Sequence, residues 1–222
     1  MTFARFQDRT EAGRLLAGKL KAYANRPDVV VLALPRGGVP VGYEVAMALH
    51  APLDVFVVRK LGVPGQEELA MGAIASGGVR VLNRPIVEAL EITESQIESV
   101  AAAEQQVLER RESLYRGGRA APVIRGKTVI LVDDGIATGS TMRAAIAALR
   151  KQQSAHLIVA VPVAPLSTVR ELQAEGDEVV CARAIEPFGA IGAWYEDFRQ
   201  VPDEQVSELL ETAAGKRSAT HA

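Results

Sequence analysis

Residues 128–142 read TVILVDDGIATGSTM, and this stretch decides how the chain folds. Residues 128–132 are an apolar, β-branched run of strand length, too short and too well bounded for a helix. Two adjacent carboxylates, Asp133 and Asp134, come next, followed by a turn rich in glycine and hydroxyl groups. From Met142 onward the composition has strong helix propensity. We therefore predict a buried strand, an acidic end, a turn and a helix in direct succession.

The turn is suited to a phosphate monoester. Backbone N–H groups of a turn that leads into a helix converge on one place, where the helix adds its positive end. Gly135 and Gly139 permit positive φ angles and close approach of the backbone to a ligand. The two carboxylates would repel a phosphate, but they suit neutral vicinal hydroxyls or a bridging Mg²⁺ ion. An ordinary loop with an aspartate cap, or the acidic pair of another Mg²⁺ enzyme, is the alternative.

The run VILVDDGIATGST closely resembles the signature of the type I phosphoribosyltransferases: an apolar strand, two acidic residues and a Thr-Gly-x-Thr phosphate turn. The resemblance implies that Asp133 and Asp134 are catalytic and bind the ribose 2- and 3-hydroxyls of phosphoribosyl pyrophosphate (PRPP). It also implies Mg²⁺ as cofactor, held by the same two residues either directly or through ribose hydroxyls or water. The 5-phosphate of PRPP would be wrapped by Ala137, Thr138, Gly139, Ser140 and Thr141.

A second loop, PRGGVP at residues 35–40, follows an apolar run that we predict to be the first buried strand. Open α/β sheets place their ligands at such carboxyl ends. Arg36 supplies a guanidinium suited to phosphate oxygens. In the resembled family the loop at this place grips the pyrophosphate leaving group, which implies roles for Arg36, Gly37 and Gly38. A tight turn with a solvent-facing Arg36 is the alternative.

Residues 59–68 are polar and broken by glycine and proline, which favours a loop. The resemblance implies that this is the mobile catalytic loop that closes over PRPP, with Arg59 and Lys60 as catalytic residues. Long loops between ordered elements are often lids. A solvated basic corner is the alternative for Arg59 and Lys60.

Apolar runs alternate with helical patterns along the chain, which predicts an α/β domain with a doubly wound, mostly parallel five-stranded sheet over residues 1–214. We expect a helical insertion at about residues 84–118 and a disordered tail at 215–222. Within the insertion, residues 92–116 form a long helix that Thr93 is expected to cap. Its apolar face is thin, so we expect it to pack loosely on the domain or on a second subunit.

A small hood at about residues 184–201 is implied by the resemblance, and it holds a large share of the few aromatic residues. Phe188 and Tyr195 are the candidates for stacking on a nucleobase, although aromatic rings are more often simply core. Two residues depart from the 6-oxopurine enzymes of the family. Ala137 stands where those enzymes carry an aspartate, and Pro187 stands where they carry a lysine. Salvage of hypoxanthine or guanine is therefore doubtful, and the sequence does not identify the acceptor base.

The composition limits the kinds of binding partner that we expect. A net charge of −2 over 222 residues shows no basic field that would indicate nucleic-acid or membrane binding. The single cysteine, Cys181, sits in an apolar run, and the first residues lack a signal peptide, so we expect a cytoplasmic protein. The expected partners are PRPP and an unidentified base, and a homodimer is left open.

These observations predict an enzyme that transfers the 5-phosphoribosyl group from PRPP to a nitrogenous base and releases pyrophosphate. Some members of the resembled family bind PRPP or nucleotides as regulators and have little transfer activity, which is the alternative. Outside the family, a generic Mg²⁺-dependent phosphate-binding α/β enzyme is the remaining hypothesis.

Overall fold

The computed structural model describes residues 4–175 and 178–220. Its central sheet has five parallel strands in the order β2-β1-β6-β7-β8. The strands are β1 (Val29–Ala33), β2 (Leu53–Val55), β6 (Thr128–Val132), β7 (His156–Pro165) and β8 (Glu178–Ile185). Every residue of β1 and β6 is buried, as the uninterrupted apolar runs of their sequences require.

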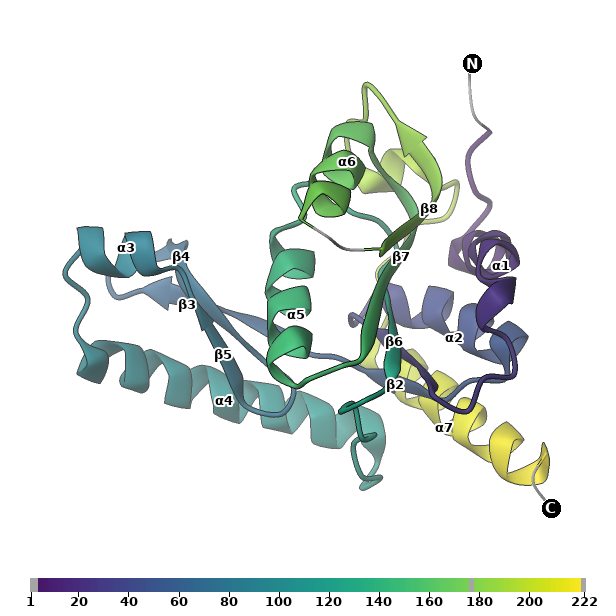
Figure 1. The fold of residues 1–222 in the computed structure, drawn as a ribbon, viewed down its shortest axis with the longest axis horizontal. Coiled ribbons are helices and arrows are strands. Elements are labelled where there is room, and N and C mark those ends of the chain that lie inside the picture. The colour runs from purple at the N-terminus through teal and green to yellow at the C-terminus, as the bar shows by residue number, and fades with distance from the viewer. Residues whose placement is uncertain (1–3, 176–177, 221–222) are drawn as a thin grey trace.

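Helices cover both faces of this sheet (Figure 1). One face carries α1 (Arg9–Lys19) and α2 (Gly38–Leu49), and the other carries α5 (Ser140–Lys151) and α6 (Leu166–Ala174). A short 3₁₀ turn, η1 (Lys21–Tyr23), follows α1. The prediction of a doubly wound parallel sheet is confirmed. In the described part of the chain, no helix combines the length and the apolar character needed to cross a membrane.

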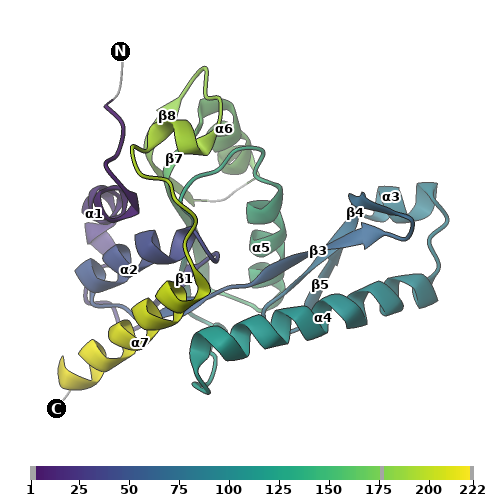
Figure 2. The ribbon, with the colours of Figure 1, turned by 180° about the vertical axis from the view of Figure 1, so that it is seen from behind.

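Residues 58–116, which we call the arm, extend away from the central sheet (Figure 2). They form an antiparallel sheet of β3 (Val58–Val63), β4 (Gln66–Ala75) and β5 (Val79–Leu82), followed by α3 (Arg84–Ala89) and α4 (Glu94–Arg116). Our prediction of a loop over residues 59–68 is therefore wrong. Leu61 and Val63 are both buried while Lys60 is exposed, an alternation that belongs to a strand. Pro64 and Gly65 make only the short turn between β3 and β4.

Helix α4 is firmly packed, contrary to our expectation. Thr93 caps it in a capping box with Gln96, which confirms the predicted start. Its buried side chains join β3, β4 and the last helix in a second apolar core; they are Ile97, Ala101, Leu108 and Tyr115. At its end, Arg116 Nε lies 2.9 Å from Asp54 Oδ2 of β2, with both side chains 11% exposed. The helix is therefore attached to the central sheet at one end, and along its length it packs against β3, β4 and the last helix.

The hood contains a 3₁₀ turn, η2 (Ile191–Trp194). The last helix, α7, runs over Asp203–Thr220, so residues 215–220 are helical where we expected a disordered tail. Three residues of this segment, Lys216, Arg217 and Ala219, have high helix propensity, which agrees with a helix here. The remainder of the expected tail, residues 221–222, lies outside the described residues.

The topology places a switch point between β1 and β6, at the carboxyl ends of the strands. Strand β2 pairs on one side of β1, and β6 pairs on the other side. The helices that follow β1 and β6 therefore leave the sheet on opposite faces (Figure 1). Ligands of open α/β sheets bind at this kind of switch point, outside the carboxyl ends of the strands.

Candidate active site

The loop after β1 lies against the carboxylates after β6. We call residues 35–38 the Arg36 loop and Asp133 with Asp134 the acidic pair. A Cβ atom on Gly37 would lie 2.0 Å from Asp134 Oδ2, and one on Gly38 would lie 2.8 Å from the carbonyl oxygen of Val132. A side chain at either position would therefore collide with the end of β6, which explains the two glycines. The structure thus brings the Arg36 loop and the acidic pair together.

The phosphate turn, residues 137–141, borders a cavity of about 200 Å³. Gly139 has φ +77° and precedes the first residue of α5, so the cavity lies at the positive end of that helix. The hydroxyl oxygens of Thr138 and Ser140 are 3.2 Å apart. The cavity is lined by Asp133, Gly135, Ile136, Ala137, Thr138, Gly139, Ser140, Thr141, Met142 and Ile191. All five residues predicted to hold the 5-phosphate therefore line it with Asp133.

Two residues that the sequence analysis missed hold this turn from outside. Arg143 Nη1 donates to the carbonyl oxygen of Thr138 at 3.0 Å, and its other nitrogens bind Glu171 and Glu175. Thr168 Oγ1 donates to the carbonyl oxygen of Ala137 at 3.1 Å. These two contacts tie the turn to α5 and α6. Arg143 could have been suspected, since it lies one helical turn after Gly139, whereas Thr168 comes from another helix.

The surroundings of the acidic pair disfavour the charged forms of its two carboxylates. Burial, together with the charge of Asp134, raises the pKa of Asp133 well above its usual range. Burial also raises the pKa of Asp134, although Arg9 opposes this effect. Arg9 Nε donates to Asp134 Oδ2 at 2.8 Å, and the Tyr195 hydroxyl donates to the Asp134 carbonyl at 2.6 Å. A cation or hydroxyl donors near Asp133 would relieve the uncompensated charge.

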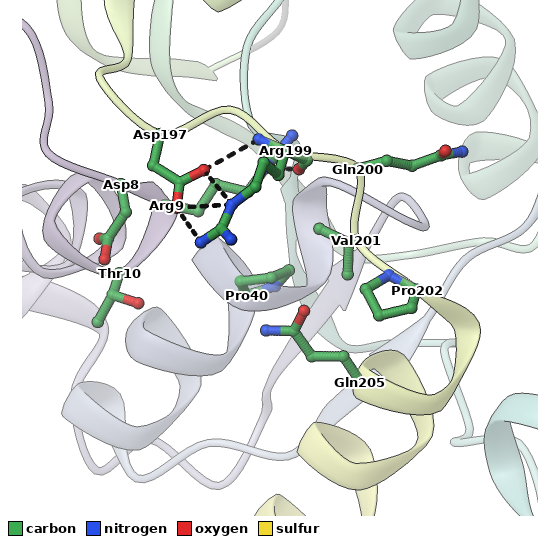
Figure 3. A pocket seen from close by; sticks show the side chains of 10 residues that line it. All are labelled: Asp8, Arg9, Thr10, Pro40, Asp197, Arg199, Gln200, Val201, Pro202 and Gln205. Carbon is green, nitrogen blue, oxygen red and sulfur yellow. Dashed lines mark hydrogen bonds and ion pairs between the residues drawn. The ribbon is translucent and has the colours of Figure 1, made fainter.

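Arg9 is a further candidate residue of the site, and no local sequence pattern predicts it. It is the first residue of α1 and lies 125 positions before its partner Asp134. Its guanidinium lies over the Phe198 ring, 4.0 Å from the centroid, and its Nη1 donates to the carbonyl oxygen of Arg199 at 2.8 Å. Figure 3 shows Arg9 at the edge of a neighbouring cavity of about 450 Å³, beside the ion pair of Asp197 with Arg199.

The three cationic side chains predicted to be catalytic, Arg36, Arg59 and Lys60, are each paired with a carboxylate. Arg36 Nη1 lies 3.8 Å from Asp203 Oδ1, and the Tyr115 hydroxyl donates to the same oxygen. This hydrogen bond and burial raise the pKa of Tyr115 to about 12, with burial as the larger cause.

Arg59 Nε donates to Glu104 of α4 at 2.7 Å, and Lys60 Nζ lies 3.3 Å from Glu68 Oε2. Lys60 nevertheless lines a cavity of about 510 Å³ together with Ser140 and Thr141. The structure therefore brings Lys60 towards the phosphate turn, while Arg59 faces α4.

Both aromatic candidates are buried beneath the site. Phe188 is 8% exposed and stacks on Trp194, and Tyr195 is 2% exposed and packs on Phe6. Burial is also the main cause that raises the pKa of the Tyr195 hydroxyl. In this arrangement the two rings form the core of the hood, so contact with a base stays a prediction that their burial does not favour.

The acidic pair fits the oxygen ligands that Mg²⁺ uses. Among the residues that the structure describes, no group of three or more His, Cys, Asp or Glu side chains could hold a metal ion. Mg²⁺ is commonly bound by one or two carboxylates with water and substrate phosphate oxygens. The residues present therefore fit an ion that arrives with its phosphorylated ligand.

We compared the chain with known protein families, curated proteins and solved structures. The sequence profile of the phosphoribosyl transferase domain matches residues 6–190. A protein of Mycobacterium tuberculosis named "Putative phosphoribosyl transferase" is 44% identical over 208 residues, which cover 94% of this chain and 47% of that protein. The chain thus spans about half the length of the curated relatives it matches.

A solved structure resembles this chain along nearly the whole length of both proteins. The crystal structure of TT1426 from Thermus thermophilus has a TM-score of 0.81 and 43% sequence identity. The match covers 93% of this chain and 97% of that chain. The fold is that of a type I phosphoribosyltransferase-like α/β domain, and the chain belongs to the phosphoribosyl transferase family.

Proposed function

We propose that the protein transfers the 5-phosphoribosyl group of PRPP to a nitrogenous base, with Mg²⁺, and releases pyrophosphate. The observation that carries this proposal is the packing of the Arg36 loop against the acidic pair, beside the phosphate turn. These three elements offer neighbouring places for the diphosphate, the ribose and the 5-phosphate of one molecule.

In this proposal the phosphate turn and the positive end of α5 hold the 5-phosphate. The acidic pair receives the ribose hydroxyls, and the backbone of Gly37 and Gly38 with the Arg36 side chain holds the diphosphate. Asp133 and Asp134 would hold Mg²⁺ together with substrate oxygens, where the ion would neutralise charge on the diphosphate.

The reaction breaks the bond between C1 of the ribose and the diphosphate oxygen and forms a bond from C1 to the base nitrogen. Positive charge grows on the ribose and negative charge on the leaving group, so catalysis depends on positioning and electrostatics. The acidic pair favours the cationic ribose, and Arg36 favours the departing diphosphate. The β3–β4 hairpin, which carries Arg59 and Lys60, would exclude water on closing.

A regulatory PRPP- or nucleotide-binding protein of the same fold is the second candidate. The pairing of Arg36, Arg59 and Lys60 with carboxylates is the observation that favours it, because each pair must open before the cation can act on the substrate. The Arg36 loop favours catalysis, since a sensor does not need to stabilise a leaving group.

The test is release of pyrophosphate from PRPP and Mg²⁺ in the presence of purine, pyrimidine and nicotinate-type acceptors. The proposal expects release that depends on one class of acceptor. Tight PRPP binding without release for any acceptor would instead support the regulatory candidate.

A further inference from the structure

The ion pair of Arg36 is looser than those of two other arginines near the site. Arg36 Nη1 lies 3.8 Å from Asp203 Oδ1, which is beyond hydrogen-bond distance. Arg9 and Arg59 instead donate to their carboxylates at 2.8 and 2.7 Å. The charge of Asp203 therefore attracts the Arg36 guanidinium, but Arg36 does not donate a hydrogen bond to this oxygen.

The same oxygen of Asp203 already accepts a hydrogen bond from another element. The Tyr115 hydroxyl, on α4, donates to Asp203 Oδ1 at 2.5 Å. Asp203 is also the first residue of α7, so the positive end of that helix stabilises its charge. Both interactions compete with Arg36 for the carboxylate, because a carboxylate with other donors gains less from a further one.

Tyr115 is held firmly where it meets Asp203. Its side chain is 1% exposed and lies in the second apolar core with side chains of α7. The next residue, Arg116, pairs with Asp54 of β2. Ser207 Oγ of α7 donates to the Leu114 carbonyl at 3.2 Å, which joins α7 to the end of α4 (Figure 2). The position of the Tyr115 hydroxyl is therefore set by α4, α7 and the central sheet together.

We propose that Tyr115 is a positioning residue for Arg36: by binding Asp203, it keeps this carboxylate from closing on the guanidinium, so that Arg36 stays available to the diphosphate. The inference rests on the proposed function, which places Arg36 at the leaving group. Without the Tyr115 hydroxyl, Asp203 would take a hydrogen bond from Arg36 and form an ordinary ion pair. The long helix α4 thereby acquires a role in the site, although it contributes no residue that contacts the substrate.

The first experiment measures how fast phenylglyoxal modifies Arg36 in the ligand-free protein, by mass spectrometry of the peptide that contains it. A directly paired guanidinium reacts more slowly, so Tyr115→Phe should slow the modification by about 3- to 10-fold, the loss of one hydrogen bond. Tyr115→Phe/Asp203→Asn should regain the wild-type rate, because the amide carries no charge. Tyr23→Phe is the matched control, since the Tyr23 hydroxyl donates to Glu178 at 2.6 Å, and it should leave the rate unchanged.

Three results would overturn the inference. The first is an unchanged or faster rate in Tyr115→Phe. The second is a slow rate that persists in the double variant, since this would assign the effect to altered packing of α4. The third comes from Asp203→Asn alone, which leaves the buried Tyr115 ring in place and keeps an oxygen that accepts its hydrogen bond. This variant should react at least as fast as the wild type, and a slower reaction would contradict the role of Asp203.

The second experiment measures pyrophosphate release from PRPP and Mg²⁺ with the best acceptor of the panel. Tyr115→Phe should lower kcat by about 3- to 10-fold and change the KM for PRPP by less than about twofold, because Arg36 acts on charge that develops in the transition state. Adding Asp203→Asn should restore kcat. A lowered kcat that the second substitution does not restore, or an unchanged kcat, would contradict the positioning role.

The two experiments separate this inference from the proposed function. If the wild-type protein releases no pyrophosphate with any acceptor, the proposed function fails. The modification rates would still decide whether Tyr115 controls the pairing of Arg36 with Asp203. If the wild type is active and Tyr115→Phe changes neither kcat nor the modification rate, this inference fails and the proposed function stands.

Discussion

Arg36 is the residue placed to act on a leaving group. Its loop follows β1 and touches the acidic pair, and its side chain is 33% exposed beside Asp203. Arg36→Ala should lower kcat by about 100-fold with a smaller change in the KM for PRPP, because the charge it meets develops in the transition state. Steady-state kinetics of pyrophosphate release measure both constants, with Arg14→Ala as the control. An unchanged kcat with a raised KM would mean that Arg36 serves binding alone.

Ala137 and Pro187 bear on the choice of acceptor. Both are exposed, and neither can hydrogen-bond through its side chain to the ring nitrogen or exocyclic oxygen of a 6-oxopurine. An unpaired polar group in a closed site costs about 1–3 kcal/mol, so hypoxanthine and guanine should be poor acceptors. Comparing kcat/KM for these bases with the best acceptor of the panel provides the measurement. Efficient turnover of hypoxanthine would mean that other residues supply those contacts.

At the scale of elements, the β3–β4 hairpin is the segment we expect to respond to PRPP. Its turn, Pro64 and Gly65, is exposed, and so are residues 66–69. Contact of Lys60 with bound diphosphate would pull this hairpin over the site, so amide hydrogen exchange at residues 65–69 should slow when PRPP and Mg²⁺ are added. Unchanged exchange at a saturating PRPP concentration would show that the hairpin is no lid. Residues 86–90, at the far end of the arm, provide an internal reference.

The end of α4 offers a prediction about stability. Arg116 pairs with Asp54 where both side chains are 11% exposed, and it also binds Glu112. Arg116→Met should lower the free energy of unfolding by about 3 kcal/mol, because buried carboxylates lose their cation. Arg80→Met, which breaks the more exposed pair with Glu98, should cost less than about 1 kcal/mol. Chemical denaturation of the two variants compares them, and equal losses would contradict the assigned role of burial.

At the scale of the whole molecule, local patterns predicted the central sheet well. The apolar runs at β1, β6 and β7 and the helical pattern after the phosphate turn specify a parallel α/β sheet without tertiary information. The edge where the Arg36 loop and the acidic pair meet follows from that topology.

The remaining features depend on contacts between distant residues. Arg9 reaches Asp134 across 125 residues, and no local pattern indicates that the two form a pair. The strand β3 was missed because glycine and proline outweighed the alternation of Leu61 and Val63. The firm packing of α4 could not be read from its thin apolar face, since its partners lie in β3, β4 and α7.

The central claim is that PRPP binds at the acidic pair, and the melting temperature with PRPP and Mg²⁺ tests it most directly. Ligand at about 100 times its dissociation constant stabilises a protein by about 2.7 kcal/mol, which for a chain of this size is about 5–10 °C. We predict a shift of this size for the wild type, a smaller one with ribose 5-phosphate, and almost none for Asp133→Asn/Asp134→Asn. A full PRPP-induced shift in the double variant, or none in the wild type, would contradict the claim.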